Sequence, residues 1–449
     1  MLTFPKGFRW GTSTSAFQIE GAVHEDGRGE SIWDRFSHTP GKITNGDNAD
    51  IACDHYHRYA DDFKLMKDLG YKHYRFSIAW PRIFPQGRGA VNQKGLDFYN
   101  RLVDSMLENG ITPNVTLYHW DLPIALDWEF RDTAEAFAAY ADVATRHLGD
   151  RIKTWATFNE PWCSSILGYG LGGHAPGKTD RSLGLRVAHH QLLAHGLAMP
   201  IIKANVPGGE AGIVINPAPT EPKTTSPADY AAYQFFDGFF NRWFLDPLFG
   251  RNYPSDMLET YVTLGQLKST EPDFVQPGDL KTIAAPLDFL GLNYYERTVV
   301  HATPGKEMQP GEHGVWKTSP DKMTDMNWEV YPDGLFNMLM GLNYSYRPAK
   351  FYIAENGAAY TDAPDATGKI NDQRRIDYID GHLRAIHHAI QAGVPVSGYY
   401  VWSFMDNFEW ANGYGKTFGL VHTNYTTQKR TPRASANWYS NVAKRNGLE

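Results

Sequence analysis

Glu160 and Glu355 each close a short apolar run of strand-like residues. Both lie among polar and aromatic neighbours, in the segments Asn159-Glu160-Pro161-Trp162 and Glu355-Asn356-Gly357. A carboxylate at the end of a buried strand costs too much free energy to be kept for packing alone. Two facing carboxylic acids suit glycoside hydrolysis, in which one protonates a leaving oxygen while the other attacks or activates water. Only tertiary folding could bring these distant glutamates together.

Eight short, largely apolar runs are predicted to be strands, because continuous apolar stretches are typical of strands buried on both faces. They are residues 8–13, 74–78, 112–117, 154–158, 212–215, 289–292, 351–354 and 396–401. Helical patterns lie between them. The clearest covers residues 376–390, where apolar positions recur every three or four residues before Gly393, and another covers residues 54–69 before Gly70.

The alternation of strand and helix continues along the chain without a composition break or a low-complexity linker. This pattern favours one domain, residues 1–449, folded as a single (β/α)8 TIM barrel of the α/β class. Residues 217–226 and 302–325 are rich in Pro, Gly, Thr and charge. We expect them to be long βα loops around the C-terminal face, where such insertions border the site in this fold.

Polar and aromatic residues gather at the C-terminal ends of the predicted strands, which share one face of a barrel. Taken alone, Asn356-Gly357 could be a turn, and Trp402 or Trp410 could be core aromatics. Their convergence carries more weight than any single motif, and this face is the predicted active site. The group comprises Arg75, His119, Trp120, Asn159, Glu160, Asn216, Asn293, Tyr294, Tyr295, Glu355 and Trp402.

The composition argues against several classes of partner. The chain has a net charge of −7 and no dense cluster of Lys and Arg, so we expect no nucleic acid partner. Residues 1–10 lack the apolar core of a signal peptide, and no apolar stretch is long enough to span a bilayer. We therefore expect a cytoplasmic protein with no membrane partner.

The many Trp and Tyr side chains suit sugars, because they offer an apolar face and a polar tip.

The spacing of cysteine and histidine does not indicate a metal or a disulfide. Cys53 and Cys163 are the only cysteines and are interpreted as free thiols. None of the 17 histidines shows the i, i+4 helical pairing of the zinc-protease motif, and His190 and His195 are a poor match. We expect neither a metal ion nor another cofactor.

Six motifs together resemble those of the family 1 glycoside hydrolases, the β-glucosidase family, in the same order and over essentially the whole chain. They are Phe8-Arg9-Trp10-Gly11, Gln18-Ile19-Glu20-Gly21, Arg75-Phe76-Ser77-Ile78-Ala79-Trp80-Pro81-Arg82, Thr157-Phe158-Asn159-Glu160-Pro161, Ile353-Ala354-Glu355-Asn356-Gly357 and Trp402-Ser403-Phe404-Met405-Asp406-Asn407-Phe408-Glu409-Trp410. The resemblance implies a retaining exo-β-glycosidase that hydrolyses terminal non-reducing β-D-glucosyl residues, and also β-galactosyl or β-fucosyl residues, by double displacement. Its partners would be small-molecule β-glycosides or short oligosaccharides.

By this resemblance, Glu160 is the general acid/base and Glu355 is the nucleophile. Arg75 and Tyr295 would hold Glu355 ionised, whereas Glu160, next to that negative charge, would keep its proton longer. Substrate binding is assigned to Gln18, His119, Trp120, Asn159, Asn293, Tyr295, Trp328, Trp402, Glu409, Trp410 and Phe418. The entrance, where the leaving group sits, is assigned to Cys163, Leu167, Tyr169, His174 and Trp328.

Glu409 supports a prediction about specificity. An acid at this position, as in the family, would hydrogen-bond O4 and O6 of the sugar and repel a 6-phosphate, so non-phosphorylated sugars are favoured. Phospho-β-glycosidases of the same family resemble one another in a Ser, Lys and Tyr grip on the phosphate. The run from Glu409 to Tyr414 does not show its opening Ser.

The chain departs from the family pattern after Asp121-Leu122-Pro123. The family usually has a longer segment with Gly-Gly-Trp here, whereas residues 124–130 reach Arg131 several residues sooner. We expect this shorter loop to alter the rim of the site and the local stability more than the chemistry.

The sequence leaves three other functions open. A transglycosylating β-glycosidase would pass the same covalent intermediate to a sugar rather than to water. A non-catalytic sugar-binding barrel should lack one carboxylate, and both are present here. A metal-dependent barrel hydrolase would lose activity to a chelator.

Overall fold

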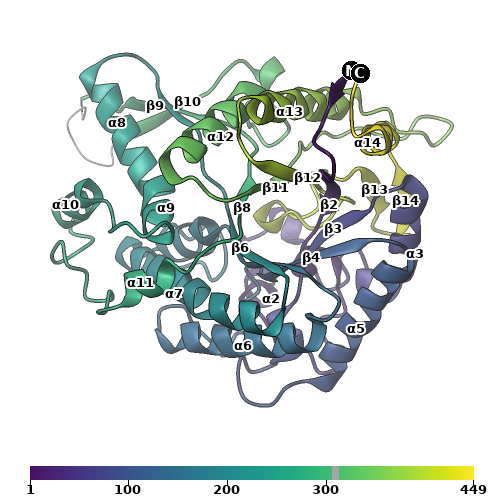
Figure 1. Ribbon diagram of the computed structural model, residues 1–449, viewed down its shortest axis with the longest axis horizontal. Helices are drawn as coiled ribbons and strands as arrows, with labels where there is room; N and C mark the ends of the chain where they lie inside the picture. The colour runs from purple at the N-terminus through teal and green to yellow at the C-terminus, as the bar shows by residue number, and fades with distance from the viewer. Residues whose placement is uncertain (306–312) are drawn as a thin grey trace.

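A closed barrel of eight parallel strands forms the centre of the computed structural model, which describes residues 1–305 and 313–449. Around the barrel the strands follow the order β11, β12, β2, β3, β4, β5, β6 and β8, and the helices surround them (Figure 1). The strands are β2 (Arg9–Ser13), β3 (His73–Ser77), β4 (Thr112–Tyr118), β5 (Thr154–Asn159), β6 (Glu210–Ile215), β8 (Phe289–Asn293), β11 (Phe351–Asn356) and β12 (Val396–Trp402). Each predicted strand is present, and the predicted fold class is confirmed.

Both helices predicted from apolar spacing are found, as α13 (Gln373–Gln391) and α3 (His55–Leu69). Helix α13 buries Ile379 and Ile386, and α3 ends at Gly70, whose φ of 80° is a left-handed conformation that glycine adopts without strain. The other long helices are α5 (Gln93–Glu108), α6 (Asp132–Leu148), α7 (Arg181–Asn205), α12 (Pro332–Tyr346) and α14 (Ala434–Arg445).

Shorter helical segments connect these elements. The α-helical ones are α1 (Ala16–Ile19), α2 (Ile32–Ser37), α4 (Trp80–Ile83), α8 (Pro227–Asp237), α9 (Trp243–Leu248), α10 (Ser255–Thr263) and α11 (Asp279–Ile283). Two are π-helical, η2 (Cys163–Gly170) and η3 (Gly238–Arg242), and three are 3₁₀ turns, η1 (Thr44–Gly46), η4 (Pro320–Lys322) and η5 (Trp410–Asn412). Single-turn π segments are often found at functional sites, and η2 follows Glu160 closely.

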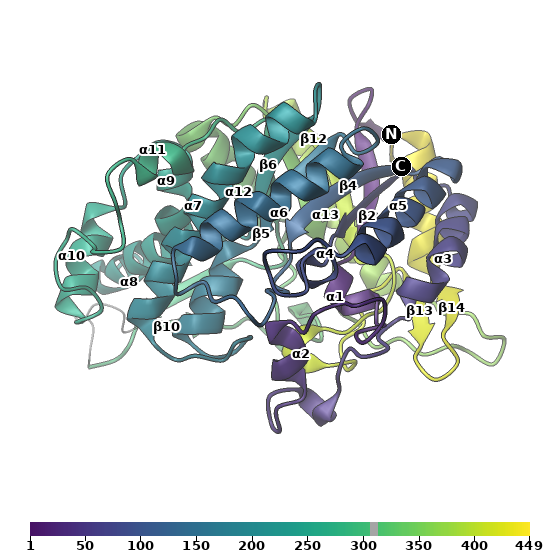
Figure 2. The same ribbon diagram turned by 90° about the horizontal axis from the view of Figure 1, so that it is seen from below.

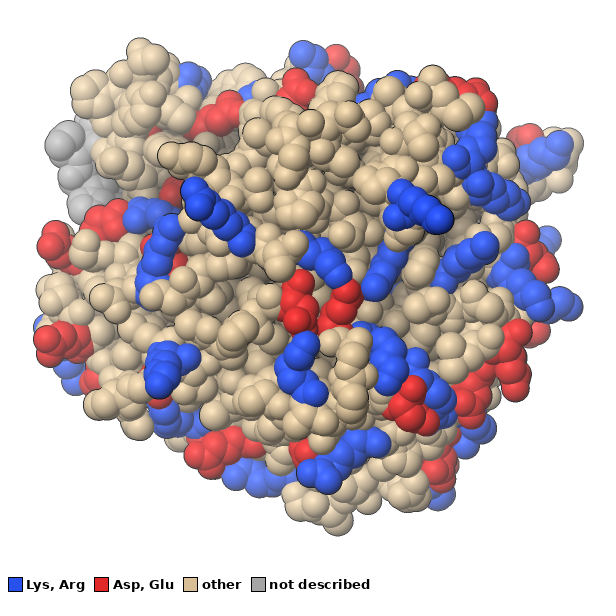
Figure 3. All heavy atoms as spheres, viewed as in Figure 1, with Lys and Arg blue, Asp and Glu red and all other residues tan. Residues whose placement is uncertain are grey.

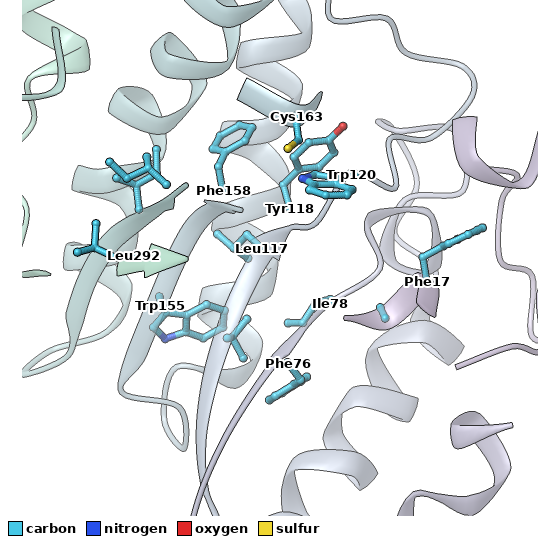
Figure 4. Packing of buried hydrophobic residues seen from close by; sticks show 14 of the residues in the cluster. Phe17, Phe76, Ile78, Leu117, Tyr118, Trp120, Trp155, Phe158, Cys163 and Leu292 are labelled. Carbon is cyan, nitrogen blue, oxygen red and sulfur yellow. The ribbon is translucent and has the colours of Figure 1, made fainter. Parts of the chain in front are cut away.

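The barrel strands are buried on both faces, as their apolar runs predicted. Phe76, Leu117 and Phe158, carried by neighbouring strands, belong to one large cluster between barrel and helices (Figure 4). Side chains at alternate strand positions point to the opposite face of the sheet. Tyr352 and Tyr400 belong to a second, smaller cluster. The barrel is therefore a packed core that holds the strand ends rigidly in place.

The two segments predicted to be irregular loops contain short strands, so that prediction is wrong in part. β7 (Thr220–Pro222) and β10 (His313–Trp316) both pair with β9 (Thr298–Ala302) in a three-stranded sheet. Residues 306–312, within the second segment, lie outside the described residues. Short strands without an apolar run give no periodic signal, which is why the sequence pattern missed them. α8 and β10 lie to one side of the barrel (Figure 2).

The two ends of the chain lie side by side. β1 (Leu2–Thr3) pairs antiparallel with β15 (Gly447–Leu448), and both ends lie on the side of the molecule away from α2 and β10 (Figure 2). A separate two-stranded sheet joins β13 (Val421–Asn424) to β14 (Lys429–Pro432).

Charged side chains of both signs are interspersed over the face seen in Figure 3, without a broad area of one sign. Across residues 1–305 and 313–449, no helix combines the length and the apolar character needed to cross a membrane.

Candidate active site

Glu160 and Glu355 line one cavity of about 470 Å³ at the C-terminal end of the barrel. Glu355 lies within β11, and Glu160 is the first residue after β5, where its φ of 47° turns the chain from the strand toward η2. A left-handed conformation is unusual for a residue with a side chain and is often found at functional sites. The strand ends therefore bring the two carboxylates to one hollow, as the barrel architecture requires.

Most of the residues predicted to form the site line this same cavity. Beside the two glutamates these are His119, Trp120, Asn159, Asn293, Tyr295, Trp328, Trp402, Glu409, Trp410 and Phe418. They come from different strand ends and loops, so the fold brings together residues that are widely separated in the sequence.

Arg75 lies beneath the cavity and pairs with Glu355. One guanidinium nitrogen donates to Glu355 Oε1 at 2.7 Å, and another donates to Asn159 Oδ1 at 2.7 Å. The Tyr295 hydroxyl donates to the other Glu355 oxygen at 2.6 Å. Both oxygens of Glu355 therefore accept charge-assisted hydrogen bonds, which favour the ionised carboxylate.

Asn293, Asn159 and Arg75 connect the two carboxylates. The Asn293 amide nitrogen donates to Glu160 Oε1 at 2.6 Å and to Asn159 Oδ1 at 3.0 Å, which uses both of its N–H groups. Asn159 Oδ1 also accepts from Arg75, which donates to Glu355. A short chain of hydrogen bonds therefore joins the two acids.

The two carboxylates differ in their proton affinity. Burial and then the negative charge of Glu355 raise the pKa of Glu160 to about 7. Burial raises the pKa of Glu355 as well, but Arg75 and the Tyr295 hydroxyl oppose that rise. Glu355 is therefore the member of the pair that ionises first, and Glu160 keeps its proton near neutral pH.

The far wall of the cavity combines aromatic faces with unsatisfied polar atoms. Trp402 and Phe418 pack together, and Trp410 lies against His119 with ring centroids 5.9 Å apart. Within the described part of the chain, Glu409 Oε2 and His119 Nδ1 are buried without a hydrogen-bond partner. Such a surface can stack against a sugar ring and hydrogen-bond its hydroxyls.

Gln18 is the exception among the residues predicted to bind substrate. Its side chain is fully buried and is not part of the cavity wall. Its amide nitrogen donates to Asn407 Oδ1 at 3.0 Å and to the Phe408 carbonyl at 2.9 Å, and its oxygen accepts from Ser15 at 2.6 Å. Both N–H groups of Gln18 are therefore in use, whereas its oxygen accepts only one hydrogen bond and has a second lone pair left.

Comparisons with known proteins agree over the full length. The family model described as Glycosyl hydrolase family 1 matches residues 1–448. The chain belongs to this family. It is 46% identical over 453 residues to Beta-glucosidase A of Acetivibrio thermocellus, covering 100% of this chain and 99% of that protein. It is 44% identical over 459 residues to the bifunctional beta-D-glucosidase/beta-D-fucosidase of Bifidobacterium breve, and this match covers 98% of this chain and 97% of that protein.

Solved family 1 structures have the same architecture. The family 1 b-glucosidase from Thermotoga maritima superposes with a TM-score of 0.94 at 45% sequence identity, over 100% of this chain and 99% of that chain. The resemblance seen in the sequence is confirmed, and the protein is a glycoside hydrolase. The alternative of a non-catalytic barrel is set aside.

The segment after Pro123, shorter than in the family pattern, is firmly anchored. Trp128 is fully buried, and its indole N–H donates to the Tyr118 hydroxyl at 3.0 Å. Its backbone N–H donates to the Tyr169 hydroxyl at 3.3 Å, and its carbonyl contacts a ring nitrogen of His190 at 2.9 Å. Tyr169 therefore lies behind the cavity wall, and the prediction that it lines the entrance is wrong.

The remaining predicted entrance residues, Cys163, Leu167, His174 and Trp328, do line the cavity of this family 1 enzyme. Sequence analysis missed an aromatic wall beside them. The Trp162 and Phe240 rings contact each other at a tilt of 34°, with ring centroids 4.3 Å apart, and Phe236 and Phe240 are stacked at 5.5 Å. The repeated Phe pairs at residues 235–236 and 239–240 were a signal for this wall. The other lining residues not predicted as substrate-binding are Asn216, Pro217, Ala218, Glu296, Thr298, Val315, Lys317, Met326 and Asn412.

Cys53 and Cys163 are both free and buried. Among the residues that the structure describes, no three His, Cys, Asp or Glu side chains form a group that could hold a metal ion.

Proposed function

We propose that this family 1 enzyme is a retaining β-glucosidase in which Glu355 is the nucleophile and Glu160 is the acid/base. The observation that carries the proposal is that both acids line one cavity and are joined by the hydrogen-bond chain of Asn293, Asn159 and Arg75. The charge of Glu355 is also a main cause of the raised pKa of Glu160, which favours the spacing of about 5–5.5 Å found in retaining enzymes over the 6.5–9.5 Å that inverting enzymes need to hold a water.

In the first step, ionised Glu355 attacks the anomeric carbon. The bond between this carbon and the leaving oxygen breaks, and Glu160 gives its proton to that oxygen. Arg75 and Tyr295 support the step by keeping Glu355 ionised, through the two hydrogen bonds to its oxygens. The product of this step is a glycosyl ester on Glu355, with the alcohol released.

In the second step, Glu160 acts as a base. Ester formation removes the negative charge of Glu355, which is one of the causes that raise the pKa of Glu160. Glu160 therefore becomes a stable carboxylate and takes a proton from water as the water oxygen attacks the anomeric carbon. The bond between this carbon and Glu355 breaks, which releases the sugar and restores the Glu355 carboxylate and the protonated Glu160. Two inversions give net retention of configuration.

The proposed substrate is a non-phosphorylated β-D-glucoside, with β-galactosides or β-fucosides as further substrates. The names of the relatives support the glucosyl and fucosyl groups. Another support is Glu409, whose buried, unpartnered Oε2 can accept hydrogen bonds from sugar hydroxyls. A phosphate group beside this acid would be repelled or would force its protonation.

Azide rescue tests the assignment of the nucleophile. Glu355→Ala should lose measurable turnover of 4-nitrophenyl β-glucoside, because no covalent ester can form. Added azide should restore release of nitrophenol by entering the space left by the carboxylate, and the product should be the α-glucosyl azide. Glu210→Gln, altered at the opposite end of the barrel at the start of β6, is the control and should give no azide product. Full activity of Glu355→Ala without azide would refute the assignment.

A further inference from the structure

The Cys163 thiol contacts the carboxyl group of Glu160 directly. Sγ lies 3.0 Å from Glu160 Oε2, while Asn293 donates to the other oxygen at 2.6 Å. Each oxygen of this carboxyl therefore has one protein partner, and the two partners differ in kind. An amide nitrogen can only donate a hydrogen bond, whereas a thiol can donate one weakly and also accept one weakly.

The local backbone holds the thiol in this place. The backbone N–H of Cys163 donates to the Glu160 carbonyl at 2.9 Å, so one short turn joins the two residues at both backbone and side chain. The hydroxyl of Ser165 donates to the Pro161 carbonyl at 2.5 Å and secures the same turn. Cys163 is the first residue of η2, directly beyond the strand that carries Phe158 (Figure 4). The sulfur is thus presented to the carboxyl by a fixed turn.

A neighbouring amide favours one orientation of the thiol. Asn216, which also lines the cavity, directs its side-chain amide nitrogen at Cys163 Sγ over 3.6 Å. This contact uses the sulfur as an acceptor, so the thiol hydrogen is left to point at Oε2. Burial together with the adjacent Glu160 raises the pKa of the Cys163 thiol, so the sulfur keeps its hydrogen and does not become a competing nucleophile.

We propose that Cys163 is a positioning residue for proton transfer by Glu160, holding Oε2 in both protonation states of the acid/base. The thiol donates to Oε2 when Glu160 is a carboxylate and accepts from Oε2 when Glu160 is an acid. The Asn293 amide nitrogen that faces Oε1 cannot accept the proton of the acid, so Oε2, facing the thiol, is the oxygen that carries it. This proposal rests on the proposed role of Glu160.

The pH dependence of Glu160 reflects several other charges, which the experiment must hold constant. Glu355 raises its pKa, and Arg75 lowers it. Glu409 and Tyr295 also interact electrostatically with Glu160. A hydrogen bond from Cys163 lowers the pKa of Glu160, since it stabilises the carboxylate. Among these direct influences on Glu160, replacing the thiol changes only the last, although it also removes the contact from Asn216 to the sulfur.

The test compares Cys163→Ala and Cys163→Ser by kcat/KM as a function of pH. In Cys163→Ala the midpoint of the alkaline limb should shift to higher pH by about 0.5 pH unit, because the Glu160 carboxylate loses one weak hydrogen-bond donor. With 4-nitrophenyl β-glucoside, kcat/KM should fall by about threefold to tenfold, a small part of what general acid catalysis contributes. With 2,4-dinitrophenyl β-glucoside, whose leaving group needs no proton, kcat/KM should fall clearly less than with 4-nitrophenyl β-glucoside. Cys163→Ser, which can also donate and accept, should restore the wild-type profile.

Two controls separate positioning from packing. Cys163→Val removes the hydrogen bonds without leaving a void, and it should behave as Cys163→Ala does. Cys53→Ser changes the other buried cysteine, which contacts the Asp406 carbonyl rather than Glu160, and it should keep the wild-type pH profile. An equal loss on both substrates with an unmoved alkaline limb would overturn the proposal. A Glu160→Gln enzyme that kept its alkaline limb would instead overturn the proposed role of Glu160.

Discussion

Arg75 and Glu355 form an almost fully buried ion pair, with 2.7 Å between the guanidinium nitrogen and Oε1. The pair joins β3 to β11 across the floor of the cavity. Because the same guanidinium also holds Asn159, it fixes the position of the carboxylate as well as its charge. A buried carboxylate without this partner would tend to protonate and lose its nucleophilicity.

Replacing Arg75 should therefore damage catalysis even if the positive charge is kept. Lysine cannot reach both Glu355 and Asn159 with a planar fork, so Arg75→Lys should lower kcat/KM by about tenfold or more. The acid limb of the pH profile should move to higher pH, because Glu355 loses part of the stabilisation of its charge. Arg9→Lys is the matched control, since Arg9 pairs with Glu210 at the other end of the barrel. An acid limb that stays in place in Arg75→Lys would contradict this reading.

Glu160 should set the alkaline limb of the activity profile. Its pKa is raised to about 7, and only its protonated form can protonate the leaving group, so kcat/KM should fall as pH rises through about 7. Glu160→Gln cannot lose a proton and should show no alkaline limb. The profile is measured for both enzymes with 4-nitrophenyl β-glucoside, whose leaving group needs the proton. A limb that persists in Glu160→Gln would have to come from another group.

Glu409 should decide between free and phosphorylated sugars. The wild type should hydrolyse aryl β-glucoside and should not act on its 6-phosphate. Burial and the two catalytic glutamates raise the pKa of Glu409 to about 8. Glu409→Gln keeps the shape but replaces one carboxyl oxygen with an amide nitrogen that cannot accept a hydrogen bond, so kcat/KM on the glucoside should drop by about tenfold to a hundredfold. Hydrolysis rates on aryl β-glucoside, β-galactoside, β-glucoside 6-phosphate and cellobiose measure this directly. Cleavage of the phosphorylated sugar alone would show that the reasoning from Glu409 is wrong.

The aromatic wall should bind the leaving group rather than the sugar. Phe240 faces the cavity, whereas Phe235, on the preceding helix α8, lines a different hollow. Phe240→Ala should raise KM for 4-nitrophenyl β-glucoside by about threefold to tenfold, the value of one aromatic contact. KM for methyl β-glucoside, which has no ring to stack, should change little. Phe235→Ala is the matched control, and an equal effect from it would point to general loosening of the helix.

Asp406 should govern stability toward acid. It is fully buried, and both its oxygens accept from Arg433, at 2.9 and 2.8 Å, which helps to lower its pKa to about 2. Asp406→Asn leaves Arg433 buried without its counter-charge, so the free energy of unfolding should fall by about 3–5 kcal/mol at pH 7. The wild type gains this stabilisation only above the unfolded pKa of about 3.9, and it should lose it as pH falls toward 2.

Thermal unfolding at pH 7 and pH 3 measures this difference, which should narrow at the lower pH. The control is Asp380→Asn, which removes a partly exposed pair with Arg384 and should change stability by about 0.5 kcal/mol or less. If the two variants melt alike at pH 7, the buried pair is not a major source of stability.

The barrel could be predicted because the same sequence pattern recurs from strand to strand. Buried strands such as β5 and β11 have continuous apolar runs, and polar groups follow them at one end. The sequence could not reveal that Asn293 and Asn159 join Glu160 to Arg75, because that role depends on distances across the barrel. It also could not show that Asn407 and Phe408 use both N–H groups of Gln18. Residue type gives no guide to hydrogen-bond partners that only the tertiary structure brings together.

Other predictions stay untested. The single catalytic domain, the absence of a cofactor and the cytoplasmic location remain predictions, as do the roles of the individual sugar-binding residues. The second sheet was missed for a physical reason: β7 and β10 are held by backbone pairing with β9, and their side chains are largely exposed or half-buried.

The pairing of β1 with β15 determines how the molecule can be handled. Both chain ends leave the protein on the side opposite the cavity, since the chain enters β2 directly from β1, at the end of the barrel farthest from Glu160. An affinity tag or a solid support attached at either end would therefore leave the cavity mouth open to incoming glycosides. A short linker between the two ends would also allow new termini to be cut elsewhere, giving circularly permuted enzymes.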